Sequence, residues 1–273
     1  MFPGADADRD AAEYAVVGAG LDASTTFQPG ARFGPRRVRH YARGFENYDR
    51  RTGQRFTDLA VHDAGDVGTT ADVAEYLDFL RGTLADLRES GAVPLTVGGE
   101  HTVSVAGVRA TDPDVFVALD AHLDLRESYA GDPLSHATVT RHALDAADRA
   151  VVVGARAGSE AEWERADADD VTVVPPVDAS DWLAGVEADR PFDGEDVYLS
   201  VDVDAFDPAY APGTGTPEPF GLTPREGRRA VRALAPASVG FDAVEVTDRD
   251  DGQAAVLAAK LLREFVYSHA AER

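Results

Sequence analysis

The feature that most constrains the fold of this chain is the alternation of short β-branched runs with longer segments of helical periodicity. The short runs predict strands at Tyr14–Val17, Val93–Val97, Val115–Leu119, Ala150–Val153, Val171–Val174, Asp196–Val201 and Val239–Val246. The longer segments predict helices at Thr70–Glu89, Ser104–Ala110, Ala137–Ala146, Glu160–Asp167, Arg225–Ala235 and Gly252–Tyr267. Because apolar strands of this kind need cover on both faces, the pattern predicts an α/β fold with a parallel sheet between helical layers.

The same pattern indicates one domain over residues 1–273. That length is within the range of a single α/β unit, and no low-complexity linker or internal repeat divides it. The segment Phe206–Leu222 is rich in Gly and Pro and predicts a long ordered loop, and such loops inside compact domains are often functional. Thr223, Pro224 and Glu226 then predict a capped helix start.

The absence of cysteine restricts the chemistry of any metal site. Disulfides and thiolate ligands are excluded, so a metal would be held by His and carboxylate groups, and oxygen-rich sites of that kind favour manganese. No apolar run reaches the roughly 18 residues that span a bilayer. The acidic segment Met1–Asp10 is not a secretion signal, so we expect a cytoplasmic protein that does not bind membranes.

The net charge of −23 comes from 49 acidic and 26 basic residues, of which only Lys260 is lysine. A basic face is missing, which argues against nucleic-acid binding. The acidic surface is either a store for cations or an adaptation to a salty cytoplasm that screens surface charges. Because Asp is spread along the whole chain, we favour the second interpretation and expect a halophilic source with salt-dependent stability.

Three groups of His and Asp side chains directly follow predicted strands. The strand Val115–Leu119 is followed by the first group, Asp120, His122 and Asp124. The strand Asp196–Val201 is followed by the second group, Asp202 and Asp204. The strand Val93–Val97 is followed by a Gly-Gly pair and then by His101, the third. In an extended chain, residues two apart point to the same side, and the carboxyl ends of parallel strands share the edge where ligands bind.

Four carboxylates at one edge would raise each other's pKa unless cations neutralise them. Four carboxylates and two imidazoles are too many ligands for one tetrahedral ion and suit two divalent ions about 3.5–4 Å apart. Such ions lower the pKa of bound water and provide a nucleophile near neutral pH. A lone Asp-x-Asp is usually a solvated turn, but three groups placed alike after strands predict a two-metal hydrolase.

The groups lie in longer motifs that resemble those of the ureohydrolase family, which includes arginase and agmatinase. The matching segments are Phe27–Pro35, Gly98–Thr102, Leu119–Asp124, Ser200–Pro208 and Ala211–Pro219. The resemblance spans nearly the whole chain and is strongest to microbial agmatinases. It implies a three-layer α/β/α fold, arginase-like, with a central and mostly parallel sheet of about eight strands. It also implies a homo-oligomer, either a trimer or a hexamer.

The resemblance further implies a role for each site residue. One of two Mn²⁺ ions would bind His101, Asp120, Asp124 and Asp202, and the other Asp120, His122, Asp202 and Asp204, so that Asp120 and Asp202 bridge. Glu245 would hold a substrate guanidinium, His136 would contact substrate or relay protons, and Asp124 would carry a proton to the leaving amine. The histidines expected to be structural or on the surface are His40, His62, His142 and His269.

The segment Leu125–Pro133 lacks the arginase pattern and is similar to that of agmatinases. Its acidic residues Glu127 and Asp132 suit a cationic amine tail. We therefore expect hydrolysis of agmatine to putrescine and urea, a step of polyamine biosynthesis, with arginine, aminopropyl-agmatine and guanidinobutyrate as alternative substrates. After Glu245 the chain reads Val246-Thr247, where the family often has Pro, and this departure concerns the shape of the pocket.

Other functional classes are less consistent with the sequence. A non-catalytic relative that keeps the fold would be expected to have lost metal ligands, and all six are present. A related deacetylase would carry an adjacent His-His pair, and a two-metal phosphatase an Asn-His-Asp cluster, neither of which occurs in the chain.

Overall fold

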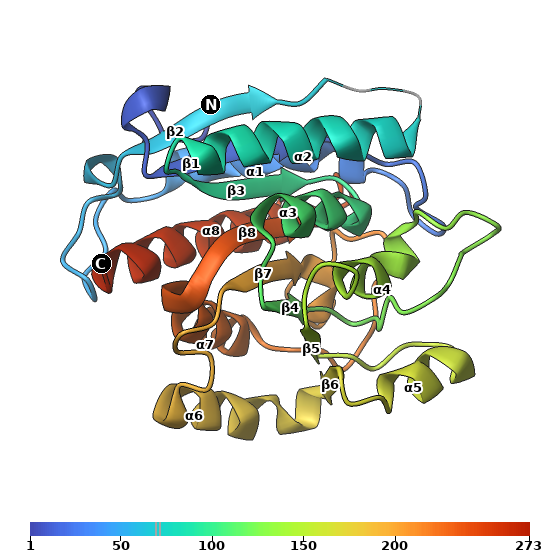
Figure 1. The fold of residues 1–273 in the computed structure, drawn as a ribbon. Coiled ribbons are helices and arrows are strands. Elements are labelled where there is room, and N and C mark those ends of the chain that lie inside the picture. The colour runs from blue at the N-terminus through green and yellow to red at the C-terminus, as the bar shows by residue number, and fades with distance from the viewer. Residues whose placement is uncertain (69, 71) are drawn as a thin grey trace.

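The computed structural model describes residues 1–68, 70 and 72–273, and a single eight-stranded sheet lies at the centre of this part of the chain (Figure 1). The strands are β1 (Tyr14–Ala19), β2 (Val61–Asp66), β3 (Val93–Gly98), β4 (Val115–Leu119), β5 (Arg149–Val153), β6 (Val171–Val174), β7 (Val197–Asp202) and β8 (Ser238–Val244). Their order is β2-β1-β3-β8-β7-β4-β5-β6, and every neighbouring pair is parallel. The predicted parallel α/β fold is confirmed.

Helices cover both faces of the sheet. They are α1 (Gly34–Tyr41), α2 (Val73–Glu89), α3 (Ser104–Thr111), α4 (Val139–Ala143), α5 (Glu160–Ala166), α6 (Ala179–Asp189), α7 (Pro224–Leu234) and α8 (Gln253–Ala271). Helices α1, α6, α7 and α8 form a continuous layer on one face, whereas α2 and α3 pack together on the other. The three-layer arrangement expected from the resemblance is therefore present.

Alternate side chains of the strands supply the apolar cores of the two faces. In β4, Val115, Val117 and Leu119 lie in the core that includes α8, whereas Phe116 and Ala118 lie in a core that includes α3 and α4. This division follows from the twofold periodicity of a strand. It also explains why the interior strand β4 is apolar throughout, since each of its residues meets a helical layer on one side or the other.

Three elements were not predicted from the sequence. Strand β2 is at the edge of the sheet, and its sequence Val-His-Asp-Ala-Gly-Asp is partly exposed, so it lacks a continuous apolar run. Helix α1 carries three arginines and one histidine and buries little apolar surface. Helix α6 buries Ala179, Leu183 and Val186, whose spacing of four and three residues is a helical signal that was available in the sequence.

Several predicted boundaries differ from the observed ones. The helix predicted at Thr70–Glu89 begins at Val73, after an N-cap at Asp72 whose side chain accepts a hydrogen bond from Glu75 N; residue 71 lies outside the described residues. The helix predicted at Ala137–Ala146 is a 3₁₀ turn followed by the short α4. The capped start at Thr223 is confirmed, because Thr223 and Glu226 form a reciprocal capping box.

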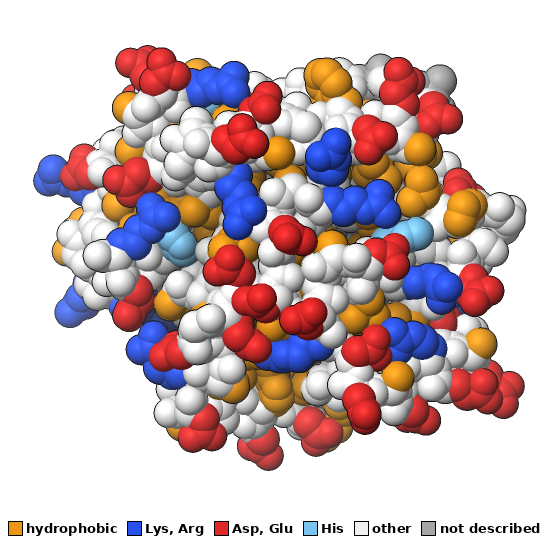
Figure 2. All heavy atoms as spheres, viewed as in Figure 1, with side chains coloured by type: hydrophobic (Ala, Val, Ile, Leu, Met, Phe, Trp, Pro, Cys, Tyr) orange, Lys and Arg blue, Asp and Glu red, His pale blue; other side chains and the backbone are white. Residues whose placement is uncertain are grey.

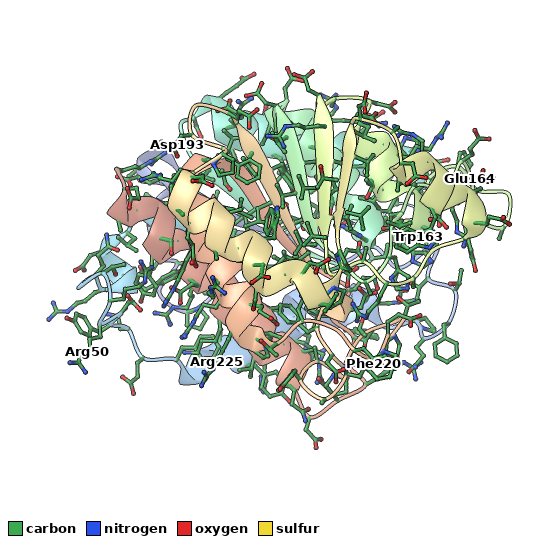
Figure 3. The ribbon with its side chains drawn as sticks, turned by 90° about the horizontal axis from the view of Figure 1, so that it is seen from below. Arg50, Trp163, Glu164, Asp193, Phe220 and Arg225 are labelled. Atoms are coloured by element: carbon green, nitrogen blue, oxygen red, sulfur yellow. The ribbon has the colours of Figure 1, made fainter. Side chains whose placement is uncertain are left out.

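The segment Phe206–Leu222 is an extended connection between β7 and α7. A bridge between Phe206 and Leu222 joins its two ends. Phe220 projects outward from this segment and is 86% exposed (Figure 3). None of the helices in the described part of the chain combines the length and apolar character needed to cross a membrane.

Candidate metal centre

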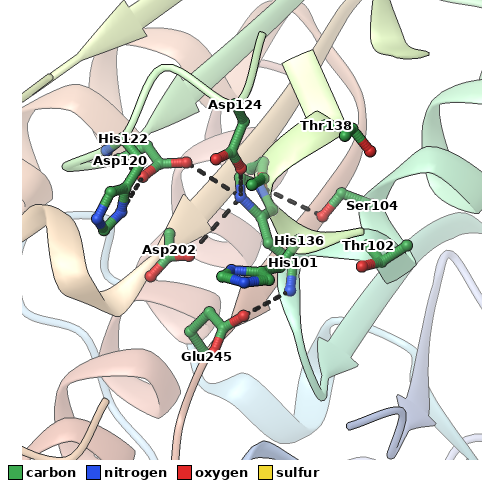
Figure 4. Close-up of polar contacts among 12 residues, drawn as sticks. His101, Thr102, Ser104, Asp120, His122, Asp124, His136, Thr138, Asp202 and Glu245 are labelled. Carbon is green, nitrogen blue, oxygen red and sulfur yellow. Dashed lines mark hydrogen bonds and ion pairs between the residues drawn. The ribbon is translucent and has the colours of Figure 1, made fainter. Parts of the chain in front are cut away.

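Four adjacent strands in the middle of the sheet, in the order β3-β8-β7-β4, end beside the predicted site. His101 lies in a 3₁₀ turn after β3, and Asp120 directly follows β4. Asp202 is the last residue of β7, and Glu245 directly follows β8. Figure 4 shows these side chains converging from their separate strands. The sheet order thus brings together residues more than a hundred positions apart in the sequence.

The backbone does not stay extended through the three groups, which corrects one sequence expectation. Asp124 has a φ of 51°, in the left-handed region, and Asp204 lies in a 3₁₀ turn over Val203–Ala205. The side chains converge because the chain curls at the ends of the strands, rather than because alternate residues of a straight strand share a side. A left-handed conformation at a non-glycine residue is uncommon and is concentrated at functional sites.

Two triads of ligand-type side chains share Asp120. His101 Nδ1 lies 3.0 Å from Asp120 Oδ2 and 3.0 Å from Asp124 Oδ2, and 3.7 Å from Asp202 Oδ2. His122 Nδ1 lies 3.0 Å from Asp204 Oδ2 and 3.6 Å from Asp120 Oδ1. Within each triad, the potential ligand atoms are within 4.8 Å of one another. Asp120 therefore offers one oxygen to each group.

The residues fit divalent cations. Asp120 is 1% exposed, and its Oδ2 is buried without a hydrogen-bond donor among the described residues. A buried carboxylate oxygen without a partner is costly unless a cation compensates it. The donor atoms are imidazole nitrogens and carboxylate oxygens, which manganese and zinc both accept.

The pKa shifts of the clustered carboxylates also favour a bound cation. Burial and the nearby Asp120 raise the pKa of Asp124 to about 7, and burial with the charge of Asp204 raises the pKa of Asp202. Burial lowers the pKa of His101, but its contacts with Asp120 and Asp124 outweigh burial and raise that pKa well above its usual value. Without cations the cluster retains protons, which divalent ions would displace.

A hydrogen-bonded chain behind His101 fixes the orientation of its ring. Ser200 Oγ donates to Asp242 Oδ1 at 2.6 Å, so His101 Nε2, 3.0 Å from Ser200 Oγ, acts as the donor to this hydroxyl. Nδ1 is then the nitrogen that faces the carboxylates. Tyr198 OH donates to the other oxygen of Asp242 at 2.8 Å. Partners of this kind orient metal-binding histidines. The sequence signal, a carboxylate inside the apolar strand β8, was available but was given no role.

Glu100 anchors a loop over the site. Its fully buried carboxylate accepts hydrogen bonds of 2.7 Å from Ser24 N, Ser24 Oγ and Thr102 Oγ1. Ser24 Oγ in turn accepts a hydrogen bond of 2.9 Å from His136 N, and Thr26 Oγ1 lies 3.3 Å from His136 Nε2. His136 is thus placed beside the triads but not within them. Burial lowers its pKa, which favours the neutral imidazole.

Glu245 is buried on the other side of His101. Its φ is 60°, its N donates to Gly99 O at 2.8 Å, and its Oε1 accepts a hydrogen bond of 2.9 Å from His101 N. Close packing here requires glycine at position 99, because a Cβ on Gly99 would lie 2.1 Å from Leu21 O. Gly215 also packs closely, and a Cβ there would lie 3.2 Å from Glu245 Oε2. Gly99 thus lets the backbone after β3 approach the backbone at Leu21 closely.

A pocket of about 240 Å³ opens beside the two triads. Its lining includes His122, Asp124 and His136 together with Arg126, Tyr129, Thr216 and Glu218. A larger hollow of about 690 Å³ between α7 and α8 contains none of the predicted site residues, so the smaller pocket is the candidate substrate site.

Glu127 and Asp132 do not line this pocket, which corrects the expectation that they meet the substrate tail. The side chain of Glu127 is 86% exposed and lies 3.6 Å from Arg141, while Asp132 accepts a hydrogen bond from Leu134 N. Other histidines lie elsewhere, as expected: His40 is exposed, and hydrogen bonds join His62 to Ala7 O, His142 to Pro133 O and His269 to Tyr14 OH.

A model of the Arginase family matches residues 12–267. This chain belongs to the arginase family. Among its relatives is an agmatinase of Pyrococcus horikoshii, 34% identical over 92% of this chain and 90% of the relative. An N(1)-aminopropylagmatine ureohydrolase of Thermococcus kodakarensis is 35% identical over 92% of this chain and 88% of the relative. The structure of the agmatine ureohydrolase of Thermoplasma volcanium superposes with a TM-score of 0.91 at 34% identity, covering 99% of this chain and 94% of that one.

Within this arginase-family fold, the clusters that directly follow strands were found from the sequence, whereas the residues that support them were missed. Ser200, Asp242 and Ser24 are small or isolated polar residues whose partners lie far away in the chain. Their roles depend on which strands are neighbours, which the sequence pattern alone does not specify.

Proposed function

We propose that this arginase-family protein is a ureohydrolase with two manganese ions, and that it hydrolyses agmatine to putrescine and urea. The observation that carries the proposal is the pair of His and carboxylate triads that share Asp120 beside a pocket. The relatives whose names specify agmatine or aminopropylagmatine support a guanidino amine as the substrate.

The metal ligands in this proposal are the six residues of the strand-end groups. His101, Asp120, Asp124 and Asp202 would hold one ion, and Asp120, His122, Asp202 and Asp204 the other. The distances around Asp120 support its bridging role directly, and Asp202 Oδ2 lies close enough to His101 to join the first group. When bound, the metal pair would supply an activated water molecule and positive charge for the developing anion.

The protein supplies the remaining functions. Glu245 pairs with the guanidinium group, because a carboxylate matches the planar fork of its donors. Water adds to the guanidinium carbon, the bond from this carbon to the substituted nitrogen breaks, and the released amine takes up a proton. Asp124 would carry that proton, because it lines the pocket beside the triads and its carboxylate can accept and donate a proton. His136, a neutral imidazole at the pocket wall, contacts the substrate.

A panel of guanidino compounds tests this assignment. With Mn²⁺ and high KCl, urea release from agmatine is expected to exceed release from arginine, guanidinobutyrate and aminopropyl-agmatine in kcat/KM. Faster turnover of aminopropyl-agmatine would make that longer amine, the substrate named for one relative, the better assignment. Absence of urea from every compound would instead support a non-catalytic relative that retains the metal site.

We further propose that the acidic surface adapts the protein to high salt. Acidic side chains are scattered over the face seen in Figure 2 and do not form one patch, which is consistent with a general adaptation. At a net charge of −23, screening by salt should relieve self-repulsion. Between low and multimolar KCl, with Mn²⁺ constant, the melting temperature is expected to rise by about 10 °C or more, equivalent to roughly 3–5 kcal/mol. An unchanged melting temperature would exclude this adaptation.

The resemblance to ureohydrolases also leads to proposals on location, assembly and domain organisation. We propose a cytoplasmic homo-oligomer, a trimer or hexamer, in which residues 1–273 form one domain. One sheet uses strands from both ends of the chain, which supports a single cooperative unit. Light scattering gives the oligomeric state, and limited proteolysis that yields two stable fragments would contradict the single domain.

A further inference from the structure

We propose that Glu218 recognises the ammonium group at the far end of the substrate and so determines specificity for guanidino amines. This inference rests on the proposed ureohydrolase function and names the residue that selects its substrate class. Glu218 lies in the segment Phe206–Leu222 and lines the 240 Å³ pocket beside His122. Its partners, its exposure and the anchoring of its backbone support the assignment.

The pocket is lined by three carboxylates, and two of them are already engaged. Asp124 Oδ2 lies 3.0 Å from His101 Nδ1 and belongs to the first triad. Glu162 is 4% exposed and lies 3.1 Å from Arg126 Nε, and it also accepts a hydrogen bond of 2.8 Å from Ser159 N. Neither carboxylate is available to a cation that enters from solvent.

Glu218 is the third carboxylate, and within the described residues no Lys or Arg lies within ion-pair distance of it. The cationic group nearest to its carboxylate is His122 Nε2, 4.0 Å from Glu218 Oε1. This nitrogen is on the opposite side of the ring from Nδ1, which faces Asp204 and Asp120. The side chain of Glu218 is 40% exposed. The carboxylate of Glu218 is therefore open to the pocket. It lies near His122 Nε2, whereas Asp120 and Asp204 lie near His122 Nδ1.

The backbone of Glu218 is fixed relative to the metal centre by Arg156. This guanidinium donates to Glu218 O at 2.7 Å and to Pro219 O at 2.9 Å, and also to Asp204 O at 2.9 Å. Thr216 Oγ1 donates to Asp204 Oδ2 at 3.0 Å. The segment that carries Glu218 is thus joined at several points to a metal ligand. A recognition group held in this way loses little conformational entropy on binding.

Among the described residues that line the pocket, the one arginine is already paired and does not offer a free cation for a carboxylate tail. Arg126 is paired with Glu162, and its guanidinium lies over the ring of Tyr129 at 5.0 Å. Both substrates carry an ammonium group on this tail, but arginine also carries a carboxylate. That carboxylate would approach Glu218 without an unpaired Lys or Arg among the described lining residues to compensate the repulsion. The arrangement selects amines both by attraction and by repulsion of the alternative.

The test compares agmatine with pentylguanidine, in which a methyl group replaces the terminal ammonium. In Glu218→Gln, we expect kcat/KM for agmatine to fall by about 10–100-fold, mainly through KM, because a charge pair at the pocket is lost. Activity on pentylguanidine should change by less than about twofold, since this tail makes no charge pair. If the wild type binds pentylguanidine without hydrolysing it, its inhibition constant against agmatine serves the same comparison.

Two variants control for other effects. Glu127→Gln removes an acidic group from a neighbouring loop outside the pocket lining and should leave both substrates unaffected. Glu218→Asp retains the charge and should recover part of the agmatine activity. Equal losses for agmatine and pentylguanidine, or no loss for either, would overturn the role of Glu218 while leaving the ureohydrolase assignment intact. A wild type that releases no urea from any guanidine would overturn both.

Discussion

Replacement of Asp120 by Asn is expected to remove both metal ions and to lower urea release by more than about 10³-fold, beyond the loss of a single stabilising group. Among the described residues, Asp120 is the one that offers an oxygen to each triad. Asparagine keeps the shape but loses the charge and one anionic oxygen, so it would no longer offer a carboxylate oxygen to both triads. Because like charges repel in the metal-free site, the loss of one carboxylate should not unfold the chain.

Metal content, circular dichroism and urea release measured on the same preparation test this prediction. The exposed Asp169→Asn is a matched control, because it makes the same chemical change away from the site. It should retain wild-type metal content and activity. A folded Asp120→Asn protein that keeps two ions or full turnover would show that the bridging assignment is wrong.

Glu245→Gln is expected to lower kcat/KM by about 10²-fold while leaving the metal content unchanged. The amide oxygen of glutamine can still accept the hydrogen bond from His101 N, so the local structure should persist. The change removes the negative charge that we propose pairs with the substrate guanidinium. Steady-state kinetics together with metal analysis separate this loss of substrate binding from a loss of metal.

The pH dependence of this carboxylate has a definite sign. In the cluster without cations, burial raises the pKa of Glu245 to about 8, and bound divalent ions would favour its charged form and lower that pKa. Only the ionised carboxylate attracts the guanidinium. Wild-type kcat/KM should therefore decrease as the pH falls through the lowered pKa that Glu245 has in the metal-bound enzyme. Unchanged kinetics in Glu245→Gln would instead place the substrate guanidinium elsewhere.

Much of the fold was predictable because its signals are local. Buried parallel strands are predominantly apolar, so seven of the eight strands of the described sheet were recognised from sequence runs. Strand β2 was missed because an edge position leaves its residues partly exposed and polar. Helix α1 was missed because its arginines obscure the apolar side that packs against α8.

The candidate ligands were predictable from the sequence, whereas the turns and supporting residues around them were not. That ligands follow the ends of strands β3, β4 and β7 could be inferred from the sequence, because the carboxyl ends of parallel strands share one edge. The left-handed turn at Asp124 and the proximity of Asp242 to His101 through Ser200 depend on strand neighbours and loop paths. The path of a loop also cannot be inferred from its sequence. For this reason Glu127 was predicted to meet the substrate tail, whereas Glu218 lines the pocket.

A count of bound manganese tests the proposed two-metal site that shares Asp120 most directly. Wild-type protein is stripped with a chelator, equilibrated with Mn²⁺ and freed of excess ion, and the bound metal is measured alongside urea release. Two triads predict two ions per chain, with activity lost on chelation and restored as the ions return. Full urea release from metal-free protein, or saturation at a single ion per chain, would contradict the assignment.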